Sequence, residues 1–239
     1  MTAETWCLLN RREMYFMKNI DKNDFIKRST DTIGDMFDML AKLPVISFKD
    51  FEEEKTALVI VDMINGFARE GALKSPRVEG VIPEIEKVSK ACDEMGIKKL
   101  AFADCHTDES PEFGSYPVHC MAGTSEWEIV DELKKIGGYK LIPKNSTNGF
   151  IEDEFQRWLE ENRDIDTFVV TGDCTDICVQ QFATTLKTWF NKQNRKSRVI
   201  VPINAVQTYD LGMHNGDLMQ VMALYNMTIN GVEIVGGIE

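Results

Sequence analysis

Short apolar runs alternate with amphipathic segments from about residue 56 to the carboxyl terminus. The runs have the length of strands and no polar alternation, which is typical of strands buried on both faces. They cover residues 56–61, 100–103, 139–143, 167–171, 198–203 and 232–235. Between them, apolar residues at three- and four-residue spacing predict helices over 83–95, 150–159, 176–190 and 214–225. This alternation predicts an α/β fold of three layers, α/β/α, with a mainly parallel sheet of about six strands.

The first 55 residues lack this alternation. Their apolar residues from Phe25 to Leu40 recur at roughly helical spacing, and Pro44 follows where a helix would end. The pattern therefore predicts an N-terminal helical extension over 1–55 and one α/β domain over 56–239.

Composition narrows the classes of function. The chain has 239 residues and a formal net charge of -12, which disfavours nucleic acid and anionic membranes as partners. No apolar stretch approaches the length of about 20 residues that spans a bilayer, and the first residues lack the pattern of a signal peptide. The six cysteines show no framework spacing. We expect a cytosolic protein with reduced thiols.

Polar residues follow four of the predicted strands, where ligands bind in sheets of this class. The carboxyl ends of parallel strands meet at one edge, so these side chains are expected to lie together. They are Asp62 after 56–61, Asp104 and His106 after 100–103, Lys144 after 139–143, and the loop from Cys174 to Cys178 after 167–171.

Cys178 has the surroundings of a nucleophile. Thr175 and Asp176 form a candidate helix cap, which would place Cys178 in the first turn of the 176–190 helix. Backbone N–H groups there favour a thiolate and bind an oxyanion. Asp62 is a candidate proton acceptor, and Lys144 would stabilise the thiolate. The combination predicts covalent acyl transfer.

Structural interpretations stand beside this one. A cysteine after a strand is often a core residue, and a single aspartate or lysine often caps a loop or carries a solvated charge. A disulfide between Cys174 and Cys178 is disfavoured at a helix entry in a reducing compartment, and two cysteines alone make a poor zinc site.

From about Thr56 onward the chain resembles the isochorismatase-like cysteine hydrolase family, which includes nicotinamidases, isochorismatases and carbamoyl-amide hydrolases. Three motifs carry the resemblance: ALVIVDMINGF, IPKNSTNGF and VTGDCTDICV. It implies a Rossmann-like three-layer fold and a catalytic triad of Asp62, Lys144 and Cys178. It also implies a cis peptide bond between Asp173 and Cys174, with the N–H groups of Cys174 and Cys178 forming the oxyanion hole.

A second region is similar to the nicotinamidase pattern: ADCH followed by YPVHCMAGT. The resemblance implies a divalent metal bound by Asp104, His106 and His119. A ligand set of this kind suits zinc, and manganese or iron less decisively.

The resemblance further implies that Phe67 and Tyr116 place their rings against the substrate, although ordinary core packing is the alternative for each. Tyr116 replaces a more usual tryptophan, and Ile64 and Gly66 replace the usual Gln and Asp of the first motif. These departures leave the triad intact and concern the shape of the pocket.

We therefore expect a cysteine amidohydrolase, a nicotinamidase that converts nicotinamide to nicotinate and ammonia through a thioester on Cys178. The alternatives are another amidase of the family acting on a carbamoyl or aliphatic amide, or a catalytically idle or redox-sensing binding protein in which Cys174 or Cys105 resolves an oxidised thiol. Isochorismatase activity is disfavoured, since that reaction does not call for the metal ligands or the nucleophile. A small-molecule amide is the expected partner, and a homo-oligomer is the expected assembly.

Overall fold

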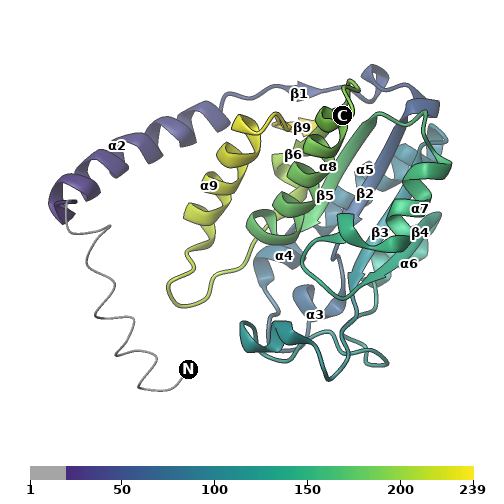
Figure 1. The fold of residues 1–239 in the computed structure, drawn as a ribbon, viewed down its shortest axis with the longest axis horizontal. Coiled ribbons are helices and arrows are strands. Elements are labelled where there is room, and N and C mark those ends of the chain that lie inside the picture. The colour runs from purple at the N-terminus through teal and green to yellow at the C-terminus, as the bar shows by residue number, and fades with distance from the viewer. Residues whose placement is uncertain (1–19) are drawn as a thin grey trace. The chain divides into compact units, whose positions relative to one another are not determined.

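A computed structural model of the chain describes residues 20–239 (Figure 1). They divide into two units, one up to Met39 and one from Leu40 to Glu239. The helix α2 (Lys22–Leu40) belongs to the first unit except for its last residue, and Phe25, Ile26 and Phe37 are exposed on it. Residues 1–19 of the predicted extension lie outside the described residues, and its boundary at residue 55 stays a prediction. No helix within residues 20–239 is both long and apolar enough to span a bilayer.

The second unit is built on a seven-stranded sheet whose pairings are all parallel. Its order is β4 (Tyr139–Lys144), β3 (Lys98–Asp104), β2 (Thr56–Val61), β5 (Thr167–Asp173), β6 (Arg198–Pro202) and β8 (Glu233–Val235), and β7 (Val206–Gln207) pairs with β5. The predicted mainly parallel sheet is confirmed. The seventh strand is the two-residue β7, which is too short to leave a hydrophobic pattern. A separate small sheet joins β1 (Val45–Ile46) to β9 (Gly237–Ile238).

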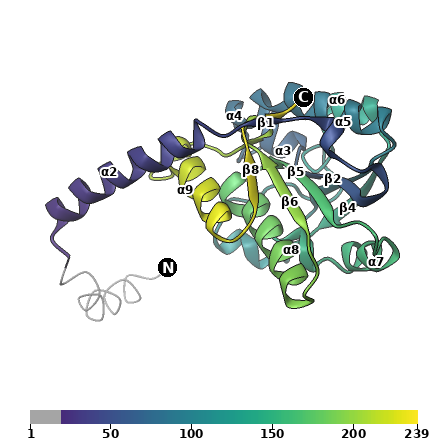
Figure 2. The same ribbon diagram turned by 90° about the horizontal axis from the view of Figure 1, so that it is seen from above.

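Helices cover both faces of the sheet, as Figure 2 shows from above. One face carries α5 (Ile82–Glu94) and α6 (Asp131–Ile136), and the other carries α7 (Asp153–Glu161), α8 (Gln180–Lys192) and α9 (Gly216–Ile229). All residues of β2 and of β5 are buried, which is why both read as continuous apolar runs. The core is correspondingly split into two clusters, one on each face.

Short helices occupy the connections. They are the α-helices α3 (Asn65–Ala68) and α4 (Pro76–Gly80), the 3-10 turns η2 (Phe48–Asp50), η3 (Glu53–Lys55), η4 (Pro111–Gly114), η5 (Gly149–Ile151) and η7 (Ile203–Ala205), and the π-helical turn η6 (Thr175–Val179).

Three predicted helices begin later or differently in the structure. The 150–159 segment is divided into η5 and α7, and the 176–190 segment enters α8 through the π-helical turn η6. The 214–225 helix begins only at Gly216, because the Asn215 side chain accepts a hydrogen bond from the Leu218 N–H and caps it there. His214 therefore belongs to the preceding loop.

Candidate active site

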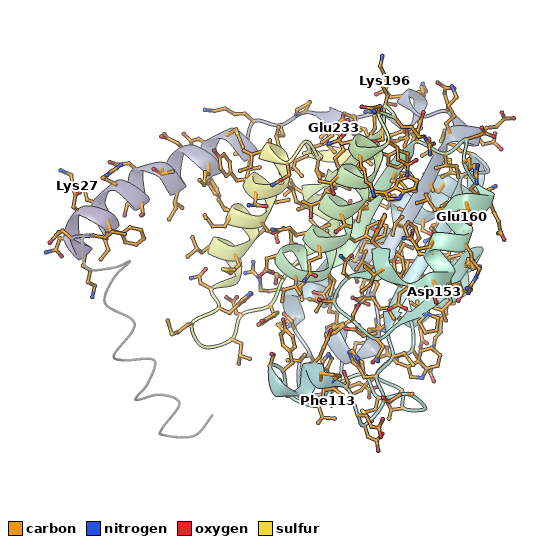
Figure 3. All side chains as sticks on the ribbon, viewed as in Figure 1. Lys27, Phe113, Asp153, Glu160, Lys196 and Glu233 are labelled. Carbon is orange, nitrogen blue, oxygen red and sulfur yellow. The ribbon has the colours of Figure 1, made fainter. Side chains whose placement is uncertain are left out.

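The residues that follow the strands meet at one edge of the sheet. Asp62, Asp104, Lys144 and Cys178 are each at most 5% exposed, and Asp104 and Lys144 are direct neighbours in the register of β3 and β4. Figure 3 shows Phe113, on η4, at this end of the molecule, far from Lys196 and Glu233 near the starts of β6 and β8. The structure thus brings together the three residues predicted as a triad.

Asp62 directly follows β2 and has an uncommon backbone conformation. Its φ of 54° lies in the left-handed region, which few residues other than glycine adopt. Its N–H donates to the Phe102 carbonyl over 3.1 Å, and its Oδ1 accepts from the Asp104 N–H over 3.0 Å. These two bonds to β3 fix the carboxylate at the edge of the sheet.

The buried Lys144 ammonium contacts the side chains of Asp62, Asp104 and Cys178. Its Nζ lies 2.8 Å from Oδ2 of Asp62 and 3.7 Å from Sγ of Cys178, and it also pairs with Oδ1 of Asp104. A third hydrogen bond runs to the Ser146 carbonyl over 3.1 Å. One cation therefore compensates two buried carboxylates beside the thiol.

The protonation states follow from burial and from this cation. Burial raises the pKa of the Asp62 carboxyl to about 6, while Lys144 opposes the rise. Burial also raises the pKa of the Cys178 thiol well above its usual value, again against Lys144. For Asp104, the Lys144 ammonium and the nearby imidazoles overcome burial and hold the pKa well below its usual range. The resting centre therefore presents a thiol beside a carboxylate that is suited to accept its proton.

The turn that carries Cys178 requires a glycine before it. Gly172 has a φ of +117°, and a Cβ there would lie 2.0 Å from the Val61 carbonyl oxygen of β2. The peptide bond between Asp173 and Cys174 is cis, as the resemblance implied. Cys174 is the residue that caps η6, and its carbonyl accepts from the N–H groups of Ile177 and Val179.

The predicted helix cap of Thr175 and Asp176 is wrong. No side chain caps η6, because Asp176 instead accepts hydrogen bonds from Thr208 and His214, which belong to a distant loop. A tertiary contact has replaced the local one.

Asp104, His106 and His119 form a compact, buried group whose ligand atoms all lie within 4.8 Å of one another. Nε2 of His106 lies 3.6 Å from Oδ1 of Asp104, and Nε2 of His119 lies 3.8 Å from Oδ2. These distances are too long for hydrogen bonds and leave room for an ion between the atoms.

The outer nitrogens of both imidazoles are already engaged. Nδ1 of His119 donates to the Pro117 carbonyl over 2.8 Å, and Nδ1 of His106 lies 2.9 Å from Oδ1 of Asn145. Nε2 of His106 is buried and has no hydrogen-bond partner. Because such outer contacts orient ligating histidines, the donor set fits a divalent metal.

Glu112 places a carboxylate oxygen beside the candidate metal ligands, and the sequence analysis did not predict this residue. Its Oε2 is buried without a hydrogen-bond partner and lies 3.8 Å from Nε2 of His106, while Oε1 accepts from the Thr147 N–H. The sequence does not single it out, because Asp108, Glu109 and Glu112 all lie between His106 and His119, in a loop whose path the sequence does not reveal.

A cavity opens over the thiol. Phe67 and Tyr116, the predicted substrate contacts, both line it, and their rings lie 5.7 and 6.1 Å from the ring of His119. Five lining residues were not predicted: Leu73, Glu112, Thr147, Ile177 and Tyr209. The cavity's polar lining consists of the candidate metal ligands Asp104 and His119, the side chains of Glu112 and Thr147, and the thiols of Cys174 and Cys178.

The two departures in the first motif, Ile64 and Gly66, are both buried. Ile64 is fully buried and bridges to Ile129. A Cβ on Gly66 would lie 2.6 Å from Sγ of Cys120, so this backbone leaves no room for the more usual aspartate. The departures therefore concern packing inside the protein and leave the three triad residues unchanged.

Comparisons with known proteins agree with this geometry. A family model described as the isochorismatase domain matches residues 56–231. Nicotinamidase 1 of Arabidopsis thaliana is 32% identical over 77% of this chain and 80% of that protein. The nicotinamidase of Acinetobacter baylyi is 28% identical over 74% of this chain and 90% of that protein. Ureidoacrylate amidohydrolase RutB of Pantoea ananatis is 26% identical over 69% of this chain and 75% of that protein.

Solved structures share the fold. N-carbamoylsarcosine amidase from Thermoplasma acidophilum gives a TM-score of 0.63 at 26% identity, covering 76% of this chain and 95% of that one. Pyrazinamidase of Pyrococcus horikoshii, solved in complex with zinc, gives a TM-score of 0.62 at 24% identity. The match covers 76% of this chain and 98% of that one.

The chain belongs to the isochorismatase family and resembles its nicotinamidase-type members. It is an amidohydrolase, an enzyme that hydrolyses a non-peptide C–N bond, with a group of residues able to hold a divalent metal.

Proposed function

We propose that this amidohydrolase is a nicotinamidase, which hydrolyses nicotinamide to nicotinate and ammonia with Cys178 as its nucleophile. The nicotinamidases of Arabidopsis thaliana and Acinetobacter baylyi support this choice of substrate. The contacts of Asp62 and Lys144 with the thiol support the choice of nucleophile.

The single observation that carries the choice of substrate is the chemistry of the cavity over the thiol. Phe67, Tyr116 and Tyr209 provide aromatic surfaces, and the described lining contains no arginine or lysine. Glu112 adds an acidic group. Nicotinamide is flat and uncharged, whereas a ureidoacrylate carries a carboxylate for which the described lining offers no cationic side chain. The cavity therefore favours nicotinamide over the substrate for which the RutB relatives are named.

Acylation begins with proton transfer. Asp62 accepts the proton of Cys178, and Lys144 stabilises the thiolate as it attacks the amide carbonyl. The C–O double bond becomes an oxyanion, which the N–H groups of Cys174 and Cys178 are proposed to bind. The C–N bond then breaks, protonated Asp62 gives its proton to the departing ammonia, and a thioester remains on Cys178.

Deacylation uses the same base. Asp62 takes a proton from a water molecule, the resulting hydroxide attacks the thioester carbonyl, and the C–S bond breaks. The acid leaves, and the proton on Asp62 returns to the sulfur of Cys178. Each cycle consumes one water and restores the thiol.

Asp104, His106 and His119 are proposed to hold zinc, with Glu112 beside them. Two imidazoles and a carboxylate are typical zinc ligands, and zinc is the metal in the pyrazinamidase complex of Pyrococcus horikoshii. When bound, the ion supplies a Lewis acid that can accept the pyridine nitrogen of the substrate.

The setting of the enzyme follows from its chemistry. A cysteine nucleophile needs a reducing compartment, which keeps the cytosol as the proposed location. A small amide is the proposed partner, and a homo-oligomer remains the proposed assembly.

The test is ammonia release from nicotinamide and from ureidoacrylate, with wild-type protein beside Cys178→Ala. We expect turnover of nicotinamide alone, its complete loss in Cys178→Ala, and an unchanged circular dichroism spectrum. Stripping the metal should reduce turnover, and zinc should restore it. Turnover of ureidoacrylate but not nicotinamide would overturn the proposed substrate, and full activity of Cys178→Ala would overturn the proposed nucleophile.

A further inference from the structure

Tyr209, which lines the active-site cavity, stacks face to face on His214. Their ring centroids are 3.9 Å apart and their planes differ by 9°. Both belong to residues 208–215, which we call the Tyr209 loop, and Tyr209 itself lines the cavity that contains Cys178. His214 thus covers one face of the Tyr209 ring, so at most the other face is available to a substrate.

His214 is held in place by both of its ring nitrogens. Nδ1 donates to the carbonyl of Tyr209 over 2.9 Å, and Nε2 lies 2.8 Å from Oδ2 of Asp176. Oδ1 of Asp176 accepts from the Thr208 hydroxyl over 2.6 Å. The side chain of Asp176 is 5% exposed and that of His214 is 17% exposed, so these bonds are largely shielded from water.

Asp176 connects this network to the nucleophile. It lies in η6, two residues before Cys178, and both of its oxygens hold the Tyr209 loop. The same carboxylate therefore fixes the distance between the ring of Tyr209 and the turn that carries the thiol. The catalytic contacts of Lys144 and Asp62 involve none of these groups.

We infer that Tyr209 is the aromatic surface that selects planar aromatic amides, and that His214, acting through its stack and its bond to Asp176, is the positioning residue for Tyr209. The inference rests on the proposed amidase chemistry at Cys178 and adds a specificity determinant to it. Stacking favours flat rings and gives nothing to a small aliphatic amide, so the ring discriminates between these two classes of substrate.

Kinetics with two substrates test the inference. Nicotinamide supplies a ring and acetamide does not, so the ratio of their kcat/KM values isolates the contribution of stacking. We expect Tyr209→Ala and His214→Ala to raise KM for nicotinamide about two- to tenfold, with kcat and the kcat/KM for acetamide changing far less. Tyr209→Phe keeps the ring and should retain the wild-type ratio.

A matched control comes from the same loop. The side chain of Met213 is fully exposed, so Met213→Ala should leave both substrates unaffected. Wild-type ratios in both Tyr209→Ala and His214→Ala would overturn the inference. An equal loss with both substrates would also overturn it, because that result describes a structural role.

A second measurement does not depend on turnover. Cys178 is alkylated with iodoacetamide or with N-phenyliodoacetamide, and the labelled peptide is quantified by mass spectrometry. We expect wild type and Tyr209→Phe to favour the phenyl reagent, and Tyr209→Ala and His214→Ala to lose that preference. If wild type releases no ammonia from nicotinamide but shows this preference, the proposed substrate fails and the inference stands. If the variants keep the preference, the inference fails whatever the substrate.

Discussion

Lys144 pairs with Asp104 as well as with Asp62, so one buried ammonium joins the candidate metal ligands to the candidate catalytic base. The register of β3 and β4 makes this possible, because it sets Asp104 and Lys144 side by side at the last position of their strands. The thiol of Cys178 completes the group at 3.7 Å from the ammonium. Changes at Lys144 are therefore expected to affect stability, metal binding and catalysis together.

Replacing Lys144 by Met removes the cation from two buried carboxylates. Leaving buried charges without a partner costs about 3–5 kcal/mol, so the free energy of unfolding should fall by that amount and ammonia release should cease. Urea denaturation measures the loss. Lys140→Met is the matched control, since Lys140 lies on the same strand and its partly exposed side chain pairs with Glu154. A Lys144→Met protein as stable as this control would contradict the expectation.

Asn145 is expected to tune metal binding without touching the metal. Its Oδ1 lies 2.9 Å from Nδ1 of His106 and so orients the imidazole. Asn145→Ala should raise the dissociation constant for zinc about 10–100-fold, measured by calorimetric titration of metal-stripped protein. Asn148→Ala is the control, because Asn148 lies in the same loop and bonds to Thr185 and Phe150 instead. Equal zinc affinities in the two variants would show that the contact with His106 does not matter.

Glu112 supplies charge beside the same histidine. Glu112→Gln keeps an oxygen for the bond from the Thr147 N–H but removes the negative charge near Nε2 of His106. We expect zinc affinity to fall by roughly tenfold or more, with the fold unchanged. The titration used for Asn145→Ala measures this as well, and an affinity equal to wild type would exclude Glu112 from the metal group.

The sequence predicted the parts of the site that stand on strands. Asp62, Asp104 and Lys144 each follow an apolar run, and parallel strands end at one edge, so pattern alone brings them together. His119 and Tyr116 are in an irregular loop, and only the family resemblance drew attention to them.

The parts that were missed depend on contacts between distant loops. Tyr209 and Glu112 face the site because of where their loops fold, which no local spacing encodes. His214 was assigned to a helix because apolar residues at helical spacing follow it. The helix begins two residues later, at Gly216, because Asn215 caps it, and His214 in the preceding loop reaches Asp176. Asp176 was assigned a capping role because it stands with Thr175 at the start of a predicted helix, whereas its side chain bonds to Thr208 and His214.

Arg77 is expected to hold the Tyr209 loop from its outer side. Its guanidinium donates to the Thr208 carbonyl and to Oε1 of Gln207, both over 3.0 Å, and pairs with Asp217 at 2.7 Å. Arg77→Ala should speed amide hydrogen exchange in residues 208–217 and leave exchange in the sheet unchanged. The exposed Arg157 on α7 provides the control variant, Arg157→Ala. Unchanged exchange in the loop would mean that other contacts suffice to hold it.

Gly172 is expected to tolerate no side chain at all. A Cβ there would lie 2.0 Å from the Val61 carbonyl oxygen, and its φ of +117° is strained for any other residue. Relief requires β5 to move away from β2, which also displaces the turn that carries Cys178. Gly172→Ala should therefore lower the free energy of unfolding by about 3 kcal/mol or more and abolish turnover. Gly80→Ala is the control: Gly80 ends α4 with nothing within 4 Å of an added Cβ, and the change should alter stability by no more than about 1 kcal/mol. Denaturation curves that place the two variants at equal stability would show that β2 and β5 can separate at little cost.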